Sequence, residues 1–510
     1  MKFQLKNNEK LFYQIITVAF LLVLVTILLN IFLFSDSTNY NTKQSFLLPN
    51  RVLYILSLAI CITVYYLIGS SKKLRNIKSS TVHIWLYSAT TLLLILQLVI
   101  VFNMYFLSGW DAGGIRSSVF EIITQKYNIW YDYSRLPNNI NITAFIVVIF
   151  KFFDSLGING YSGILIVNIL LVNLAGVFTF LCTYNITHNL RHSIFSWFVF
   201  AFLIALSPWI SIPYTDTFAM VFPIFAFYLY ISKKPESKNL VTWFWVGFLC
   251  LVGYTIKPTV IIVLIAILLI EAWKVASNFA RNKIYSFLFS IVMIAIAAIP
   301  VFWVSNYSRN LIGIRLDNNR KFTFLHFAMM GLNSDSDGAY SENDVLYSMS
   351  FDTVSERNAG NIEIIQDRLD DFGVIGYLKH LAKKNLVSFS DGSFDWSGEG
   401  NFYQEIPERS GELSLFLKDL YYRGGVYHLY LLTFQQVLWF VVLILLTTIS
   451  LSVKELDGNK TVVMLTIIGI TFFVMLFEAR ARYLYSYSPF FLVGASVGLS
   501  GIVQRIKKRG

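Results

Sequence analysis

Long apolar runs constrain the fold of this chain more than any other feature of its sequence. Runs of about 15 to 24 residues recur from residue 11 to residue 502, and a helix needs about 20 residues to cross the hydrocarbon core of a bilayer. Inside a bilayer every backbone polar group must be paired, which only helices and closed barrels achieve. The runs are longer than barrel strands, and 56% of the residues are apolar against 14% charged. The sequence therefore predicts an all-α polytopic membrane protein.

Twelve of these runs are predicted to span the membrane. The first, residues 11–34, follows a basic tail and lacks a small-residue cleavage site, so we expect an uncleaved anchor. The run at residues 142–153 is short and interrupted by Lys151, and we expect it to lie on the outer membrane surface. The other predicted spans are residues 52–68, 84–107, 162–184, 194–212, 217–231, 241–255, 258–273, 284–305, 429–451, 461–477 and 484–502.

Loop charges predict the orientation of the chain. With the N-terminus in the cytoplasm, the loops on that side carry most of the basic residues, as the positive-inside rule requires. If residues 142–153 crossed the membrane, every later loop would change sides and the bias would reverse. We therefore expect a bacterial plasma membrane protein with both termini cytoplasmic. The net charge of +11 reflects this bias and attraction to anionic membrane lipid, and it requires no nucleic-acid partner. The basic residues on this side are Lys72, Lys73, Arg75, Lys78, Arg191, Lys233, Lys234, Lys238, Lys274, Arg281, Lys283, Lys454, Lys460, Arg505, Lys507, Lys508 and Arg509.

The composition divides the chain into four parts. Three are apolar, whereas residues 306–428 are polar and charged and about the size of a small domain. We expect this part to lie outside the membrane and to be mainly helical. The apolar parts are residues 1–83 with two spans, residues 84–305 as a transmembrane core with a first outer loop at residues 108–160, and residues 429–510 with the last three spans.

Within the polar part, residues 361–389 carry apolar side chains at mostly helical spacing. Gly373 and Gly376 interrupt this pattern, which predicts two helices rather than one. The remainder is predicted to form loops, among them residues 332–344 and residues 390–403.

Cysteine usage indicates neither a disulfide framework nor a metal cluster. Cys61, Cys182 and Cys250 all fall within predicted spans, where single cysteines behave as small apolar residues. No cofactor is indicated, and a divalent metal ion is possible without being indicated.

The first outer loop carries the most specific sequence, SGWDAGGIRSSVFEIITQKYNIWYDYSRLPNN, at residues 108–139. Asp111 stands just beyond the preceding span, beside Gly113 and Gly114, which we expect to let the backbone turn sharply and approach a ligand closely. The loop also holds cations, aromatic rings and amides that suit a ligand with a sugar, a phosphate and a lipid. The alternative is a solvated loop with interfacial aromatic anchors. The candidate substrate-binding residues here are Arg116, Tyr133, Arg135, Asn138 and Asn139.

Three further polar segments fall on the same predicted side as Asp111. One contains Asp216 and follows a predicted kink at residues 207–213, the second contains Lys257, and the third is EARARY at residues 478–483. Ionisable residues at such positions are costly and usually functional. The alternatives are helix capping by Asp216, snorkelling by Lys257 and headgroup binding by the arginines. The candidate substrate-binding residues in these segments are Tyr214, Lys257, Glu478, Arg480, Arg482 and Tyr483.

Trp396 is a further candidate for substrate binding. It lies in the acidic and aromatic loop at residues 390–403, with Asp391, Asp395 and Glu399. Such a composition can bind a sugar by ring stacking and hydroxyl hydrogen bonds. An ordinary acidic loop that packs on its neighbours is the alternative.

A lone aspartate just after a transmembrane helix, in a first long outer loop with short juxtamembrane helices, resembles the C-type (GT-C) integral membrane glycosyltransferases. Protein O-mannosyltransferases and lipid A aminoarabinose transferases belong to that group. The segments SGWDAGG and YSRLPNN are similar to a Gram-positive bacterial branch that decorates cell-envelope polymers. The resemblance extends over the helices from residue 84 onward. Because its motifs are short, it indicates the superfamily better than the substrate.

The resemblance implies an inverting glycosyltransferase that moves a sugar from a polyprenyl-phosphate donor to a cell-envelope glycopolymer or a lipid-linked glycan, at the outer membrane face. Asp111 would be the catalytic base for the acceptor hydroxyl. Lys257 and the two arginines of EARARY would hold the leaving phosphate. Relatives often have paired acids in the first loop. Ala112 occupies the partner position here, so Asp216 is the candidate second catalytic acid.

A transporter or flippase of lipid-linked saccharides is the main alternative. Such a protein should have internal two-fold repeats and charges near the bilayer midplane. The sequence has no clear example of either feature. A structural scaffold for envelope synthesis is the third reading.

Overall fold

The described part of the chain is mainly helical. Within it the chain forms helices joined by loops and contains no β-sheet. The prediction of an all-α polytopic membrane protein is confirmed by this architecture and by the lengths of its apolar helices. The computed structural model describes residues 2–36, 40, 43–70, 79–104, 108–126, 129–232, 240–277, 280–396, 411–450 and 457–507.

Nine helical segments in the described residues are long and apolar enough to cross a membrane. Three shorter apolar helices, Leu190–Ala205, Leu240–Ile256 and Ser488–Ile502, coincide with the remaining three predicted spans. The helices concerned are α1 (Lys2–Phe34), α2 (Asn50–Ser70), α3 (Ser79–Asn103), α6 (Gly160–Thr187), α7 (Leu190–Phe200), α9 (Val221–Ser232), α10 (Leu240–Ile256), α11 (Ile261–Ala276), α12 (Arg281–Leu311), α17 (His428–Thr447), α18 (Gly458–Leu476) and α20 (Ser488–Lys507).

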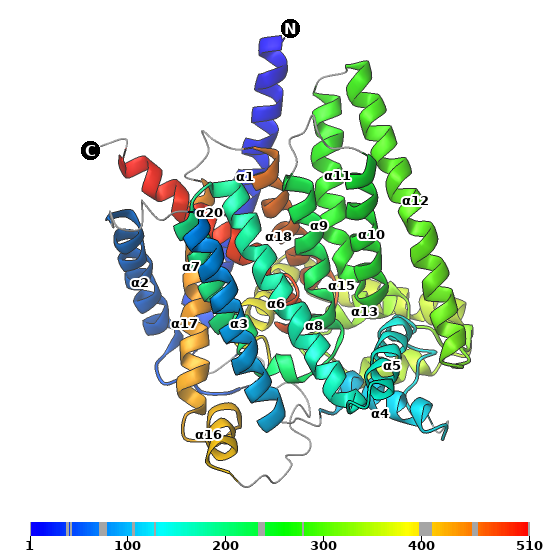
Figure 1. The fold of residues 1–510 in the computed structure, drawn as a ribbon. Helices are drawn as coiled ribbons and strands as arrows, with labels where there is room; N and C mark the ends of the chain where they lie inside the picture. The colour runs from blue at the N-terminus through cyan, green and yellow to red at the C-terminus, as the bar shows by residue number, and fades with distance from the viewer. Residues whose placement is uncertain are drawn as a thin grey trace.

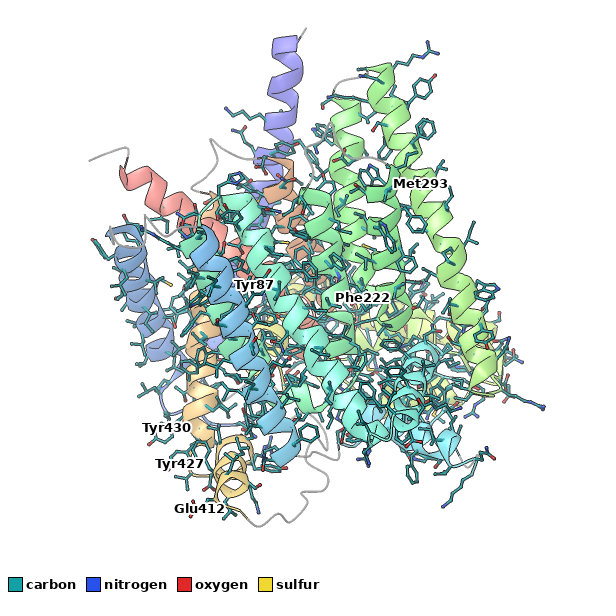
Figure 2. All side chains as sticks on the ribbon, in the orientation of Figure 1. Tyr87, Phe222, Met293, Glu412, Tyr427 and Tyr430 are labelled. Carbon is teal, nitrogen blue, oxygen red and sulfur yellow. The ribbon has the colours of Figure 1, made fainter. Side chains whose placement is uncertain are left out.

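These helices form one bundle (Figure 1), and many of their large apolar side chains are exposed. Helix α17 packs on α20 and α2, while α6 packs on α9 and α7. Large side chains such as Trp439 and Phe227 are fully buried between them. Tyr87 on α3 and Tyr430 on α17 lie on the outside of the bundle, 69% and 61% exposed (Figure 2). The outer face of the bundle is therefore suited to lipid.

One predicted span is broken near its end. Helix α7 passes into a π-helical turn and then a 3₁₀ turn, so the predicted kink at residues 207–213 is confirmed. Gln97 donates to the Ala205 carbonyl at 2.7 Å, and Asn168 donates to the Ile210 carbonyl at 2.8 Å. Such amides satisfy the carbonyls that a helix break leaves without partners. The segments involved are the π-helix Ala201–Ala205, the 3₁₀-helix Pro208–Ser211 and α8 (Thr215–Ala219).

Two helices of the first outer loop, α4 (Trp110–Ile123) and α5 (Asn139–Ser155), lie at the end of the bundle away from the start of α1 and the end of α20 (Figure 1). Helix α5 covers the predicted surface segment and packs on α4 and α6. Its inner face, with Ile142 and Ile146, is buried, whereas Phe152 is exposed. The predicted helix is thus present, and its contact with the membrane surface stays a prediction.

The polar part begins within the long helix α12 and continues through several short helices. The prediction of two helices around Gly373 is confirmed, because Gly373 has φ +52° and ψ −173° and divides α15. The prediction that the remainder forms loops is wrong for three segments, which are helical because tertiary packing stabilises helices that are too short to be stable alone. The elements are the 3₁₀-helix Asn318–Arg320, α13 (Phe324–Gly331), α14 (Glu342–Met349), α15 (Val354–Phe389) and α16 (Glu412–Tyr421).

The polar part is joined to the transmembrane core. Phe322, Met330 and Val345 form a small apolar cluster of their own, whereas Phe389 and Trp396 belong to the main core. The predicted loop at residues 390–403 is described as far as residue 396, and Glu399 lies outside the described residues. Several predicted cytoplasmic charges also lie outside them, namely Lys72, Lys73, Arg75, Lys78, Lys233, Lys234, Lys238, Lys454, Lys508 and Arg509.

Candidate active site

Asp111 lies in the first turn of α4, next to a residue with an unusual backbone. Trp110 has φ +44°, a region that non-glycine residues rarely adopt. The Tyr214 hydroxyl donates a hydrogen bond to Asp111 Oδ2 at 3.2 Å. The Asp111 side chain is half-buried, and the N-terminus of a helix stabilises a carboxylate. The carboxylate is therefore held in place while part of it stays accessible.

The two glycines after Asp111 do not make the sharp turn predicted for them. Both are inside α4, and their role is close packing. A Cβ on Gly113 would lie 2.2 Å from the Ser108 carbonyl oxygen, and one on Gly114 would lie 2.3 Å from the Tyr131 ring. The turn instead falls at Trp110, while Gly114 lets an aromatic ring approach the helix.

Aromatic and amide side chains of the first loop lie near Asp111. Asn139 donates to the Tyr131 hydroxyl at 2.7 Å, and the Tyr133 hydroxyl shares a hydrogen bond with Thr143 at 2.8 Å. The rings of Tyr131 and Tyr133 meet edge to face at 4.8 Å between centroids. Burial, and then the negative charge of Asp111, raise the pKa of Tyr131 well above its ordinary value. This tyrosine therefore stays protonated and is a hydrogen-bond donor at neutral pH.

Asp216 is buried between two cations. It lies in the first turn of α8 and is ion-paired with Lys257, which precedes a 3₁₀ turn at the start of α11. Its other carboxylate oxygen lies 3.7 Å from Arg482 Nε. All three side chains are at least nine-tenths buried. Burial of charge is tolerated only when the charges are paired, so this cluster fixes three separate segments to one another.

Arg482 connects this ion cluster to the Asp111 side of the site. Its guanidinium carbon lies 4.3 Å from the centroid of the Trp110 ring and 5.6 Å from that of Tyr214. Its backbone N–H donates to Asp395 Oδ2 at 3.3 Å. Stacking of a guanidinium on aromatic faces is favourable and leaves its edge available for further hydrogen bonds. Asp111, Tyr214, Trp110 and Arg482 therefore form one continuous set of contacts.

The EARARY segment forms a second charged group beside the first. Glu478 accepts from Arg480 Nε at 2.7 Å and from the Tyr483 hydroxyl at 2.6 Å. Burial acts to raise the pKa of Glu478, but the charges of Arg480 and Arg482 and the hydrogen bonds from Tyr483 and Arg480 together outweigh it, so the pKa lies below its ordinary value. Lys257 Nζ lies 5.4 Å from the Tyr483 ring centroid. Glu478 is thus an ionised anchor that orients Arg480.

Three further candidates from the first loop, Arg135, Asn138 and Arg116, lie beside the groups described above. Arg135 pairs with Asp132 at 2.8 Å and also contacts Met349 in the polar part. Asn138 donates to Asn139 at 3.1 Å, which makes it a neighbour of the aromatic group. Arg116 is half-buried on α4, five positions after Asp111 and so roughly 140° further around the helix.

Trp396 is fully buried. Its indole N–H donates to Gln435 Oε1 at 2.8 Å, and its ring packs edge to face on Tyr421 and His428. Both ring faces are therefore covered by protein, which leaves none for the sugar stacking expected of it.

Three side chains in this region were not among the sequence candidates. Trp110 and Tyr131 fall in the stretch at residues 108–139 that the sequence singles out, but their contacts depend on the fold. Asp395 carries an acidic-loop signal, and its link to Arg482 joins segments 87 positions apart. Within the described residues, no three His, Cys, Asp or Glu side chains are arranged to hold a metal ion.

Residues 1–501 match the family described as "Conserved hypothetical integral membrane protein", and the chain belongs to this family. No curated protein matches it in a sequence search. Family membership therefore places the chain among integral membrane proteins and leaves its activity open.

Solved structures give distant likenesses. Two are oligosaccharyltransferases from Archaeoglobus fulgidus: AglB with an inhibitory peptide and a dolichol-phosphate (13% identity, TM-score 0.41, 83% of this chain) and an apo form (12%, 0.39, 89%). The third is ArnT from Cupriavidus metallidurans bound to undecaprenyl phosphate (11%, 0.33, 84% of this chain and 79% of that one). The chain spans about half the length of each oligosaccharyltransferase, 51% in both cases.

Proposed function

We propose that this protein is a membrane glycosyltransferase that transfers a sugar from a polyprenyl-phosphate donor to a cell-envelope glycopolymer or a lipid-linked glycan. One observation carries the proposal. A half-buried carboxylate, Asp111, lies in one set of contacts with a buried cation, Arg482, through Trp110 and Tyr214. Glycosyl transfer from a lipid phosphate needs such a base and such a cation side by side.

Asp111 is suited to the role of general base. The acceptor hydroxyl oxygen forms a bond to the anomeric carbon while the bond from that carbon to the phosphate oxygen breaks. The hydroxyl proton passes to Asp111, and the polyprenyl phosphate leaves with the electron pair. A single displacement of this kind inverts the anomeric configuration. The Tyr214 hydrogen bond at 3.2 Å holds the carboxylate for this step.

The basic residues are suited to the leaving phosphate. Arg482 and Arg480 present guanidinium groups, which can bind two phosphate oxygens at once. Preorganised positive charge at a leaving group is commonly the largest catalytic contribution. Asp216 is occupied by Lys257 and Arg482. We therefore assign it to holding the cations in place, in preference to the role of a second catalytic acid.

Replacement of Asp111 by asparagine tests the proposal. Asp111→Asn keeps the size of the side chain but removes its basicity, so turnover should fall by about two to four orders of magnitude, the usual contribution of a general base. Donor affinity should stay nearly unchanged, because the base acts on the acceptor in the transition state. The donor is first identified by mass spectrometry of the lipid that co-purifies with the wild-type protein.

Asp154→Asn is the matched control, because Asp154 is an exposed aspartate at the end of α5. It should keep wild-type turnover. Near-wild-type turnover in Asp111→Asn would remove the residue on which the proposal depends.

A further inference from the structure

Lys384 is a fully buried lysine that none of these roles uses. It lies in the second half of α15, and its Nζ donates to the Gly331 carbonyl at 2.8 Å and to the Phe477 carbonyl at 2.6 Å. Gly331 is the last residue of α13, and Phe477 caps the end of α18. One side chain therefore meets the C-terminal ends of two helices, where the helix dipoles favour a cation.

The surroundings of Lys384 are packed so closely that only glycine fits at two positions. A Cβ on Gly331 would lie 2.6 Å from the Phe477 carbonyl oxygen and 2.9 Å from Lys384 Nζ. Gly338, at φ +77°, would place a Cβ 2.8 Å from the Gly331 carbonyl oxygen. The Gly338 carbonyl in turn accepts from the Ala479 N–H at 2.7 Å. These groups form a joint between the polar part of the chain and the start of the EARARY segment.

We propose that Lys384 is a positioning residue, which fixes the backbone at Phe477 and thereby aims the arginines of the EARARY segment at the donor phosphate. This inference rests on the proposed function. Arg480 is three residues beyond Phe477, and the Arg482 N–H is fixed at the other end by Asp395 at 3.3 Å. The segment is thus held at both ends. Misplacement of a binding group by about 1 Å can reduce a rate by about a hundredfold.

The charge state of Lys384 supports this role. Burial lowers the pKa of Lys384 to about 7, while Glu478 opposes the shift. Below that pH the ammonium makes charge-assisted bonds to both carbonyls, and above it the bonds weaken. The other titratable groups facing this joint are His380 and Lys383 on α15, Asp337 in the loop before α14, and Glu478. Burial lowers the pKa of His380, which moves its titration below this window.

Lys384→Met, with Lys384→Gln as a second variant that retains an amide donor, tests the proposal in the full chain. Lys383→Met is the matched control, because Lys383 is next in sequence but pairs with Asp337 at the surface. The first readout is hydrogen exchange at the Ala479 amide. The second is the affinity for methyl farnesyl phosphate, a diester that lacks the titration near pH ~6 of phosphate monoesters.

In Lys384→Met we expect faster exchange at Ala479. We also expect an affinity for the diester about tenfold weaker, which corresponds to the loss of one charge-assisted hydrogen bond between an arginine and the phosphate. Wild-type affinity should fall as the pH rises through about 7, whereas the affinity of Lys384→Met should stay weak and flat. Lys383→Met should match the wild type, and Lys384→Gln should fall between the two.

Unchanged exchange at Ala479 in both Lys384 variants would overturn the positioning role, whatever happens to ligand binding. A general rise in exchange over the whole chain would equally overturn it, because it would assign Lys384 to overall stability. Absence of diester binding by the wild-type protein would instead count against the proposed function, and exchange at Ala479 would still decide the role of Lys384.

Discussion

At the scale of single residues, the pairing of Asp216 with Lys257 gives each side chain two possible roles. Lys257 can bind the donor phosphate, or it can serve only to neutralise a buried carboxylate. Asp216 is 1% exposed, and its second oxygen lies 3.7 Å from Arg482 Nε. Removal of Lys257 alone would therefore disturb the fold as well as any phosphate site.

A double substitution separates these two roles. Lys257→Met should lower the free energy of unfolding by about 3–5 kcal/mol, the usual cost of breaking a buried ion pair. Lys257→Met with Asp216→Asn should regain part of this loss, because the Asp216 carboxylate no longer stays buried without Lys257, while Arg482 loses its own carboxylate partner. If Lys257 binds the donor, affinity should be weak in both proteins. Thermal unfolding in detergent and donor binding are the two measurements.

Two results would contradict this expectation. Equal instability of the single and the double variant would mean that the ion pair is not what stabilises this region. Recovery of donor affinity in the double variant would assign Lys257 to charge neutralisation alone.

The residues of the candidate site could be singled out in the sequence because charge is rare among apolar helices. Asp111, Asp216, Lys257 and the EARARY segment stand out in the sequence for this reason. Their partners were not predictable. The contact of Arg482 with Trp110 joins residues far apart in the chain, and the packing of Gly114 on Tyr131 depends on a ring position that only the fold sets.

At the scale of elements, the break in α15 is determined by one glycine. Gly373 combines φ +52° with ψ −173°, a conformation essentially restricted to glycine. Apart from the adjoining backbone, no heavy atom of the described residues lies within 4 Å of the position its Cβ would take, so backbone strain opposes a side chain there. Gly376, three residues later, has ordinary helical geometry. A Cβ added there would lie 3.5 Å from Phe372 Cβ, an ordinary van der Waals contact.

Alanine substitutions at these two glycines should therefore have opposite effects. Gly373→Ala should destabilise the protein by about 1–3 kcal/mol through strain. Gly376→Ala should be neutral or stabilising by up to about 1 kcal/mol, because alanine favours helix over glycine. Thermal unfolding in detergent measures both. Equal destabilisation by the two substitutions would show that steric crowding, and not backbone conformation, makes glycine necessary in this helix.

Hydrophobic patterning predicted the transmembrane helices well and the short helices poorly. A membrane helix needs a long apolar run, which is visible in sequence without knowledge of its neighbours. Helices α13, α14 and α16 have 8 to 10 residues each. Helices of that length are unstable alone and form through tertiary contacts, and in α13 also through the Thr323 cap, so a short apolar pattern alone does not predict them.

At the scale of the whole molecule, the helices of the first outer loop and the described basic residues at the junction of α11 with α12 lie at opposite ends of the bundle. The start of α1, the end of α20 and the junction of α11 with α12 share one end, whereas α4 and α5 lie at the other (Figure 1). Lys274, Arg281 and Lys283 belong to that junction. The positive-inside rule therefore predicts that α4, Asp111 and the polar part face outward.

Labelling of single cysteines in intact cells with a membrane-impermeant thiol reagent tests this orientation. Ser334 in the polar part and Asn282 at the start of α12 are both exposed. Ser334→Cys should react in intact cells, and Asn282→Cys should react only after the membrane is permeabilised. The native cysteines are all buried, so the wild-type protein provides the background. Reaction of Asn282→Cys but not of Ser334→Cys in intact cells would place Asp111 on the cytoplasmic side, where no extracytoplasmic glycopolymer could reach it.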